Sequence, residues 1–183
     1  MTVIPQWIVL ILLCLFSALL PAEELSDGCL KRVFMHYCLG GSLSRLLQQR
    51  PVDMDPIVNG DRAGIIYAKG RERIYVMAFQ GRIYKVLKTY EPSNQVTLQR
   101  LQRTLSEKYG RHQDISHLPQ YARNMAGKIG AVRRGEGELK YRWQLPASPW
   151  RVELTWTRKL GIALAYLVNT LDRQQREADE SSL

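Results

Sequence analysis

The sequence contains no hydrophobic run long enough to span a membrane comfortably. Its longest apolar run extends over 14 residues, from Trp7 to Leu20, and is followed by Pro21-Ala22-Glu23. A transmembrane helix needs about 20 apolar residues, whereas this length is typical of the apolar core of a secretory signal peptide. We therefore predict that residues 1–22 are a signal peptide cleaved near Ala22, which implies a periplasmic or secreted protein. Because no Lys or Arg precedes the run, an uncleaved membrane anchor and a cytosolic core segment remain as alternatives.

Cysteine is scarce, with three residues in the whole chain. Leu13 precedes Cys14 where a lipoprotein would have a small residue, so no acylation site is predicted there. The other two, Cys29 and Cys38, would lie in an oxidising compartment and are predicted to form a disulfide. A continuous helix would hold them about 13 Å apart, beyond the roughly 7 Å limit for a disulfide, so the chain must fold back between them. Two buried thiols are the alternative.

Signatures of catalysis are also missing. No Ser, Cys or Thr stands in a Gly-x-Ser-x-Gly nucleophile turn, and the 17 acidic residues are scattered. Enzyme activity is therefore not indicated, and no cofactor is predicted. One group has the side chains that Zn²⁺ prefers, namely His112, Asp114 and His117, with Glu107 on the preceding helix. Its spacing matches no standard zinc motif, but it supports an alternative function as a metal-dependent hydrolase.

The segment from Arg73 to Gly110 has the clearest structural pattern. Residues 74–79 and 83–90 have strand character and are joined by a turn at Gln80-Gly81. A helix comes next, capped by Ser93 or Asn94 and ended by Gly110. Its apolar residues recur at spacings of three and four, which predicts a buried face; they are Leu98, Leu101, Leu105 and Tyr109.

The C-terminal part has a strict alternation of apolar and polar residues. It covers residues 138–145 and 150–157 and predicts antiparallel strands with one face on the core. Residues 160–168 fit either a strand or a helix, and we favour a strand followed by a polar helix from Asn169 to about Asp179. The aromatic residues here are predicted to be core residues rather than a stacking platform.

The N-terminal part is predicted to contain a strand at 33–39, a helix that starts after Ser42, a loop at 51–61 and a strand at 63–68. The order of these predicted helices and strands along the chain indicates an α+β fold in which helices cover one face of an antiparallel sheet. It also indicates two successive α-β-β-β units. Residues 23–183 are expected to form a single domain, with 30–110 and 111–183 as possible sub-units.

Four short segments give the chain a resemblance to exported proteins of Gram-negative bacteria that have no assigned activity. They are the CLGGS corner, FQGRIYKV, the EKYG helix end and the strand WRVELTW. These segments are structural, so the resemblance implies an exported protein but supplies no catalytic or ligand-binding residues.

Basic residues outnumber acidic ones, and the net charge is +9. They are concentrated in residues 123–134 and along Arg100, Arg103, Lys108 and Arg111. The first group lies in a glycine-rich stretch from Arg111 to Gly137, predicted to be an irregular loop or to hold a short helix around 119–127. Loops on a rigid scaffold often carry binding residues. We therefore predict a non-enzymatic envelope protein that binds an acidic envelope protein, an anionic lipid or lipopolysaccharide, and no nucleic acid. The predicted contacts are Arg123, Lys128, Arg133 and Arg134; the alternative is that they only keep the protein soluble.

Overall fold

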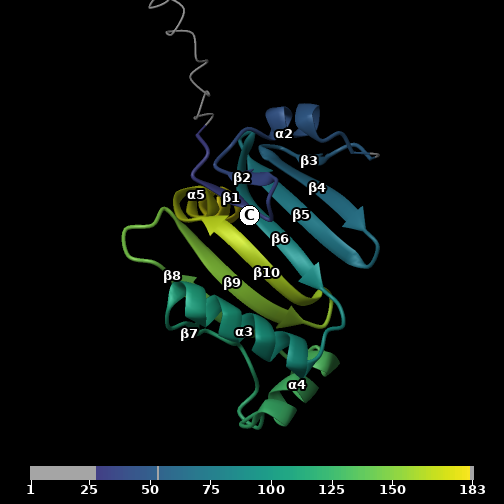
Figure 1. The fold of residues 1–183 in the computed structure, drawn as a ribbon, viewed down its shortest axis with the longest axis vertical. Coiled ribbons are helices and arrows are strands. Elements are labelled where there is room, and N and C mark those ends of the chain that lie inside the picture. The colour runs from purple at the N-terminus through teal and green to yellow at the C-terminus, as the bar shows by residue number, and fades with distance from the viewer. Residues whose placement is uncertain (1–27, 53, 182–183) are drawn as a thin grey trace, which may run out of the picture.

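The computed structural model describes residues 28–52 and 54–181, so the predicted signal segment lies outside the described residues. The α+β class is confirmed (Figure 1). The strands are β1 (Lys31–Val33), β2 (Tyr37–Leu39), β3 (Ile57–Asn59), β4 (Arg62–Lys69), β5 (Glu72–Phe79), β6 (Arg82–Tyr90), β7 (Gln113–Asp114), β8 (Leu139–Gln144), β9 (Trp150–Thr157) and β10 (Gly161–Val168). The helices are α2 (Leu43–Gln49), α3 (Gln95–Tyr109), α4 (Met125–Arg134) and α5 (Asn169–Glu180). Within the described residues, none of these helices has the length and hydrophobicity needed to cross a membrane.

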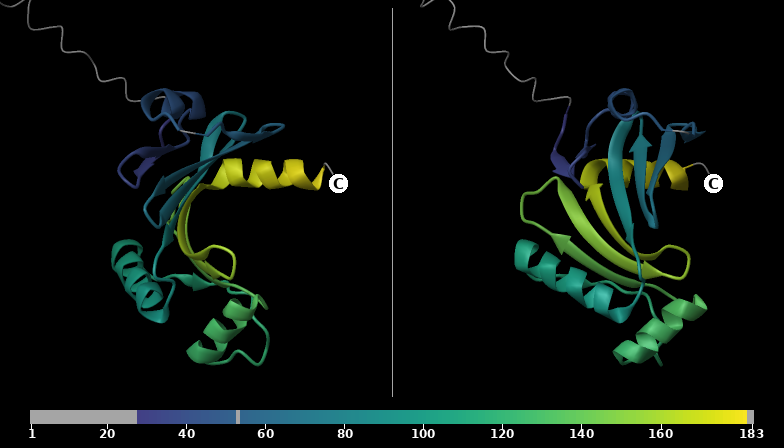
Figure 2. Two further views of the ribbon diagram at one scale, coloured as in Figure 1. Left: turned by 90° about the vertical axis from the view of Figure 1, so that its right-hand side faces the viewer. Right: turned by 45° about the vertical axis from the view of Figure 1, so that its right-hand side comes forward.

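Eight strands form one antiparallel sheet in the order β3-β4-β5-β6-β10-β9-β8-β7. The meander β4-β5-β6 and the meander β8-β9-β10 meet at its centre, where β6 pairs with β10. The β1–β2 hairpin and α3 lie on one side of this sheet, and α5 projects from the other side, toward which the sheet is concave (Figure 2). We call these two sides the covered face and the open face. Helix α4 lies at the lower end of the sheet, and its buried residues Ile129 and Val132 belong to the same core as those of α3.

The covered face holds the main hydrophobic core. Alternate residues of β8, β9 and β10 point toward it, and Trp143, Val152 and Ile162 are at most 1% exposed. Helix α3 begins where Asn94 accepts a hydrogen bond from the Thr97 amide, and its C-cap is Gly110. The indole of Trp143 donates a 3.0 Å hydrogen bond to the Gly110 carbonyl, which fixes the end of α3 to β8. The predicted apolar stripe is therefore confirmed as a core contact.

The N-terminal strand prediction is partly wrong. Residues 33–39 do not form one strand, because the chain reverses at Phe34 and Met35, which have φ angles of 45° and 68°. This reversal makes the β1–β2 hairpin and brings Cys29 to Cys38, with a Cα–Cα distance of 5.4 Å. The predicted disulfide is thereby confirmed. A glycine, Gly41, stands after the hairpin at a place where a Cβ would press on Cys38 at 3.2 Å.

Two segments predicted as irregular contain regular structure. Residues 57–59 of the predicted loop 51–61 form the edge strand β3. The stretch from Arg111 to Gly137 contains β7 and the ten-residue helix α4, which starts with an Asn124 cap and ends at Gly135. The sequence signal for α4 is weak because two glycines interrupt it. Conversely, the strand at 161–168 and the helix after it are confirmed as β10 and α5.

Leu98 provides a test of the α3 core contact. Its side chain is fully buried, so Leu98→Ala should lower the free energy of unfolding by about 2–5 kcal/mol through lost burial and a residual cavity. Val96 lies on the same helix but is 73% exposed, so Val96→Ala should change the free energy of unfolding by less than about 0.5 kcal/mol. Denaturant unfolding of both variants measures the difference, and equal effects would contradict this packing.

The disulfide provides a second test. It closes a loop of ten residues, from Cys29 to Cys38, so replacing both cysteines by alanine should cost roughly 2–3 kcal/mol, mainly through the unfolded state. Mass spectrometry after alkylation without reduction should find no modified thiol at these positions. Free alkylation of both residues in the native protein would show that the bond is absent.

Candidate functional site

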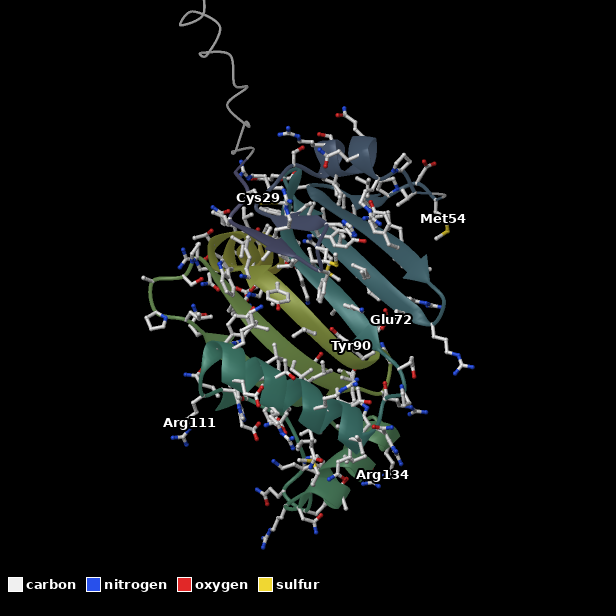
Figure 3. All side chains as sticks on the ribbon, viewed as in Figure 1. Cys29, Met54, Glu72, Tyr90, Arg111 and Arg134 are labelled. Atoms are coloured by element: carbon white, nitrogen blue, oxygen red, sulfur yellow. A yellow bond between two sulfur atoms is a disulfide. The ribbon has the colours of Figure 1, made fainter. Side chains whose placement is uncertain are left out.

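The four predicted basic contacts do not converge on one point. Lys128 forms an ion pair with Asp114 at 3.5 Å, and Arg134 binds Glu136 at 2.9 Å. Arg134 lies at the lower end of the molecule, far from Cys29 (Figure 3). Arg123 and Arg133 are exposed and have no ion pair within the described residues, but they flank the two ends of α4. A helix of this length separates its ends by about 15 Å, so one small anion cannot bind both.

The predicted metal site is not formed. The imidazole of His112 packs on Tyr141 and Trp143, and its two nitrogens lie 3.0 Å from Gln102 Nε2 and 3.4 Å from Ser106 Oγ. His112 is therefore a structural residue beneath α3.

The other proposed ligands have different surroundings. Partial burial opposes ionisation of Asp114, but hydrogen bonds from Ser116 and the charge of Lys128 lower its pKa. His117 is exposed and pairs through its backbone with Glu138. In the described part of the chain, no group of three or more His, Cys, Asp or Glu side chains is placed to hold a metal ion. The hydrolase alternative thus loses its ligands.

The open face of the sheet carries long polar side chains around a floor of small ones. Ala163 and Ala165 on β10 are at most 3% exposed although no helix element lies directly over the sheet centre (Figure 2). Their neighbours in register shield them instead. Residues that pair across neighbouring strands form three rows on this face, each running from β8 toward β5. The row through Ala165 contains Arg142, Glu153, Ala165, Leu87 and Tyr75, and the row through Ala163 contains Lys140, Thr155, Ala163 and Thr89. The third row contains Gln144, Arg151, Leu167, Lys85 and Met77.

Glu153 is the centre of an ion-pair network on this face. Its carboxylate is 5% exposed and lies 2.8 Å from Arg151, 3.0 Å from Arg142 and 3.4 Å from Lys140. Burial alone would raise its pKa, but the hydrogen bond from Arg151 and the three positive charges outweigh it and lower the pKa of Glu153 to about 2. Glu153 is therefore ionised at every physiological pH.

Asp172 extends the network to α5. Its carboxylate is 10% exposed, accepts a 2.7 Å hydrogen bond from Arg151 and lies 3.1 Å from Arg176. At the far end of α5, Asp179 pairs with Arg62 on β4. The helix is thus tied to both meanders by charge, which explains why so polar a helix is held against the sheet.

Lys85 stands beside this network without a direct partner. It occupies the same row as Arg151, two strands away, and is partly buried. Burial lowers its pKa, and the charges of Glu153 and Asp172 offset that effect only in part. Among residues 28–52 and 54–181, no hydrogen bond or ion pair reaches its ammonium group. Its register places it on the open face with Arg151.

A pocket of 380 Å³ opens at the lower end of the same face. It forms where the β4–β5 turn, the end of β6 and the β9–β10 turn meet, because β6 pairs with both β5 and β10. Three exposed cations line it, Arg71, Arg73 and Lys159, and the pocket has a single acidic lining residue, Glu91. Gly70, Tyr75, Thr89 and Leu160 complete the lining. We call this the basic pocket.

Sequence reasoning missed both sites for the same reason. Charged residues that alternate with aromatic ones on β8 and β9 indicate a solvent-exposed face. They predict a surface of mixed charge, without a patch of one sign. The pocket residues lie in three segments that are distant in the chain. The available signal was the pair of small residues, Ala163 and Ala165, in the middle of an otherwise bulky strand.

Comparison with known proteins adds no assignment, since no protein family, no curated protein and no solved structure matches the chain.

The Glu153 network predicts a specific pH dependence of stability. A carboxyl group whose pKa falls from 4.5 to about 2 on folding stabilises the protein above pH 4.5 and loses this effect as the pH falls toward 2. Glu153→Gln should therefore cost on the order of 3 kcal/mol at pH 7, and the difference from wild type should shrink between pH 4.5 and pH 2. Denaturant unfolding at several pH values measures it.

Glu177 supplies the matched control. It pairs with Arg173 on the exposed side of α5 at 3.8 Å, so Glu177→Gln should change stability by less than about 0.5 kcal/mol at any pH. A Glu153→Gln effect that is small, or that does not change with pH, would contradict the role given to the network.

Proposed function

We propose that this chain is an exported, non-enzymatic binding protein that docks its open face on an anionic partner of the cell envelope. Export is supported by the signal-like N-terminal segment together with the disulfide in the first hairpin. The resemblance to exported proteins of Gram-negative bacteria agrees with it. The expected partner surface is one of anionic lipid or lipopolysaccharide headgroups, and an acidic envelope protein is the competing partner.

One observation carries the proposal. Six cations without an ion pair in the described structure lie on or beside the open face, the side of the sheet that α3 and the hairpin leave uncovered. They are Arg71, Arg73, Lys85 and Lys159 on the open face, and Arg123 and Arg133 beside and on α4. A concave surface of one sign raises the local concentration of oppositely charged partners.

The helices that flank the open face fit a docking role. Helix α5 projects from the open face and α4 lies at its lower end, so a partner surface that docks on the open face would lie between them (Figure 2). The Glu153 network holds α5 rigidly at one end. At the other end of the sheet, Ile129 and Val132 of helix α4 pack on β8 and β9. Preorganised elements lose little conformational entropy on binding.

Vesicle sedimentation tests the proposed function. We expect the purified protein to bind phosphatidylglycerol vesicles at about 0.05 M salt and to be released at about 0.5 M, since exposed charges are screened beyond about 10 Å at 0.1 M. Arg123→Glu combined with Arg133→Glu should weaken binding at least fivefold, or about 1 kcal/mol, without a change in Tm. Phosphatidylcholine vesicles should not bind.

The matched control places the same charge reversal on the opposite side of the molecule. Arg100 and Arg103 are exposed on α3, and reversing both should leave vesicle binding within about twofold. Equal losses from both double variants would mean that net charge, not the open face, determines binding. No binding at low salt would refute the lipid partner and leave the acidic protein to be tested by cross-linking in envelope extract.

A further inference from the structure

The strand order and pairing of the two meanders are symmetric about the β6–β10 pair at the centre of the sheet, and we take the Leu87–Ala165 pair as the reference point. Leu87 on β6 pairs with Ala165 on β10, and next to them Tyr75 on β5 pairs with Leu87 and Glu153 on β9 pairs with Ala165. The register therefore makes Tyr75 the equivalent of Glu153. Two residues earlier on each strand, Arg73 is the equivalent of Arg151. The protein thus carries two arginines in matched positions on the open face.

The two arginines have opposite environments. Arg151 is 7% exposed and contacts Glu153 at 2.8 Å and Asp172 at 2.7 Å. Asp172 reaches it because α5 starts directly after β10 and stays on the open face. After β6, in contrast, the chain turns at Pro92 and forms α3 on the covered face. No helix brings a carboxylate to Arg73 within the described residues, and Tyr75 stands where the other meander has Glu153.

The space that an α5-like helix would use is the basic pocket. Arg73 lines it together with Arg71 and Lys159, and in the described residues none of these side chains has a hydrogen bond or an ion pair. The backbone around Arg73 is fixed, since the Thr89 hydroxyl accepts from the Arg73 amide at 3.1 Å and donates to its carbonyl at 3.3 Å. Arg73 is therefore held in place while its guanidinium lacks an anionic partner.

We infer that the basic pocket binds a phosphate monoester group, which takes the place that Asp172 has beside Arg151. Three cations and one carboxylate leave two uncompensated positive charges, and a phosphate monoester carries a charge of about −1.5 to −2 at pH 7. An arginine guanidinium matches the geometry of phosphate oxygens through paired hydrogen bonds. The inference deepens the proposed function and rests on it, because such a group is present in anionic headgroups as well as in free phosphate.

Calorimetric titration of the purified protein with inorganic phosphate, and separately with glycerol phosphate, tests the pocket without any membrane. Saturable binding to one site is expected. Arg73→Gln should weaken it at least about tenfold, the effect of losing a charge-assisted hydrogen bond. Tyr75→Glu, which recreates the carboxylate of the other meander, should abolish binding while the protein stays folded by near-ultraviolet circular dichroism.

Arg103→Gln is the control, since it removes the same charge from an exposed helix position on the covered side, and it should leave phosphate binding within about twofold. Phosphate binding that is absent, or that is equally strong in wild type and Arg73→Gln, overturns the pocket. If vesicles bind while phosphate does not, the proposed function stands and the pocket inference fails. If phosphate binds while vesicles do not, the pocket stands, its ligand is soluble, and docking on lipid fails.

Discussion

The pairing of β6 with β10 is the contact on which the rest of the structure depends. It joins two meanders into one continuous sheet, although the paired residues Leu87 and Ala165 are 78 positions apart in the chain. Every other strand pair of the large sheet lies within one half of it. The covered face becomes a single core only through this pairing, because α3 belongs to the first half by sequence and packs on β9 and the second half in space. A loss of the β6–β10 contact would expose both half-cores.

The same pairing creates the difference between the two halves of the open face. Related strands place Arg73 and Arg151 in equivalent positions, and the helix that succeeds each meander determines their surroundings. Pro92 interrupts the strand ladder and sends the chain to the covered face, whereas β10 continues without a break into α5. One arginine is therefore neutralised by a buried aspartate and stabilises the fold. The other, Arg73, has no ion pair among the described residues, and the proposed phosphate site depends on it.

Much of the fold could be predicted from the sequence because its signals are local. Alternation identified the faces of β8 and β9, the leucine spacing identified α3, and two cysteines in a chain expected to be exported indicated the disulfide. The failures concern information that is not local. The turn at Phe34 and Met35 has no glycine or proline to mark it, and α4 is hidden by Gly127 and Gly130. No periodicity indicates that the β4–β5 and β9–β10 turns meet.

The candidate site shows the same limit in terms of charge. In the sequence, the basic residues around α4 are the strongest candidates for binding an anionic partner. In the structure, two of them, Lys128 and Arg134, form ion pairs with Asp114 and Glu136. The availability of a cation depends on whether the fold brings a carboxylate within about 4 Å, since a close ion pair cancels most of the field that a partner would feel. In this protein the fold supplies carboxylates to Arg151 and withholds them from Arg73. The cations available to the proposed partner are therefore determined by where the chain crosses from one face of the sheet to the other, and only secondarily by the net charge.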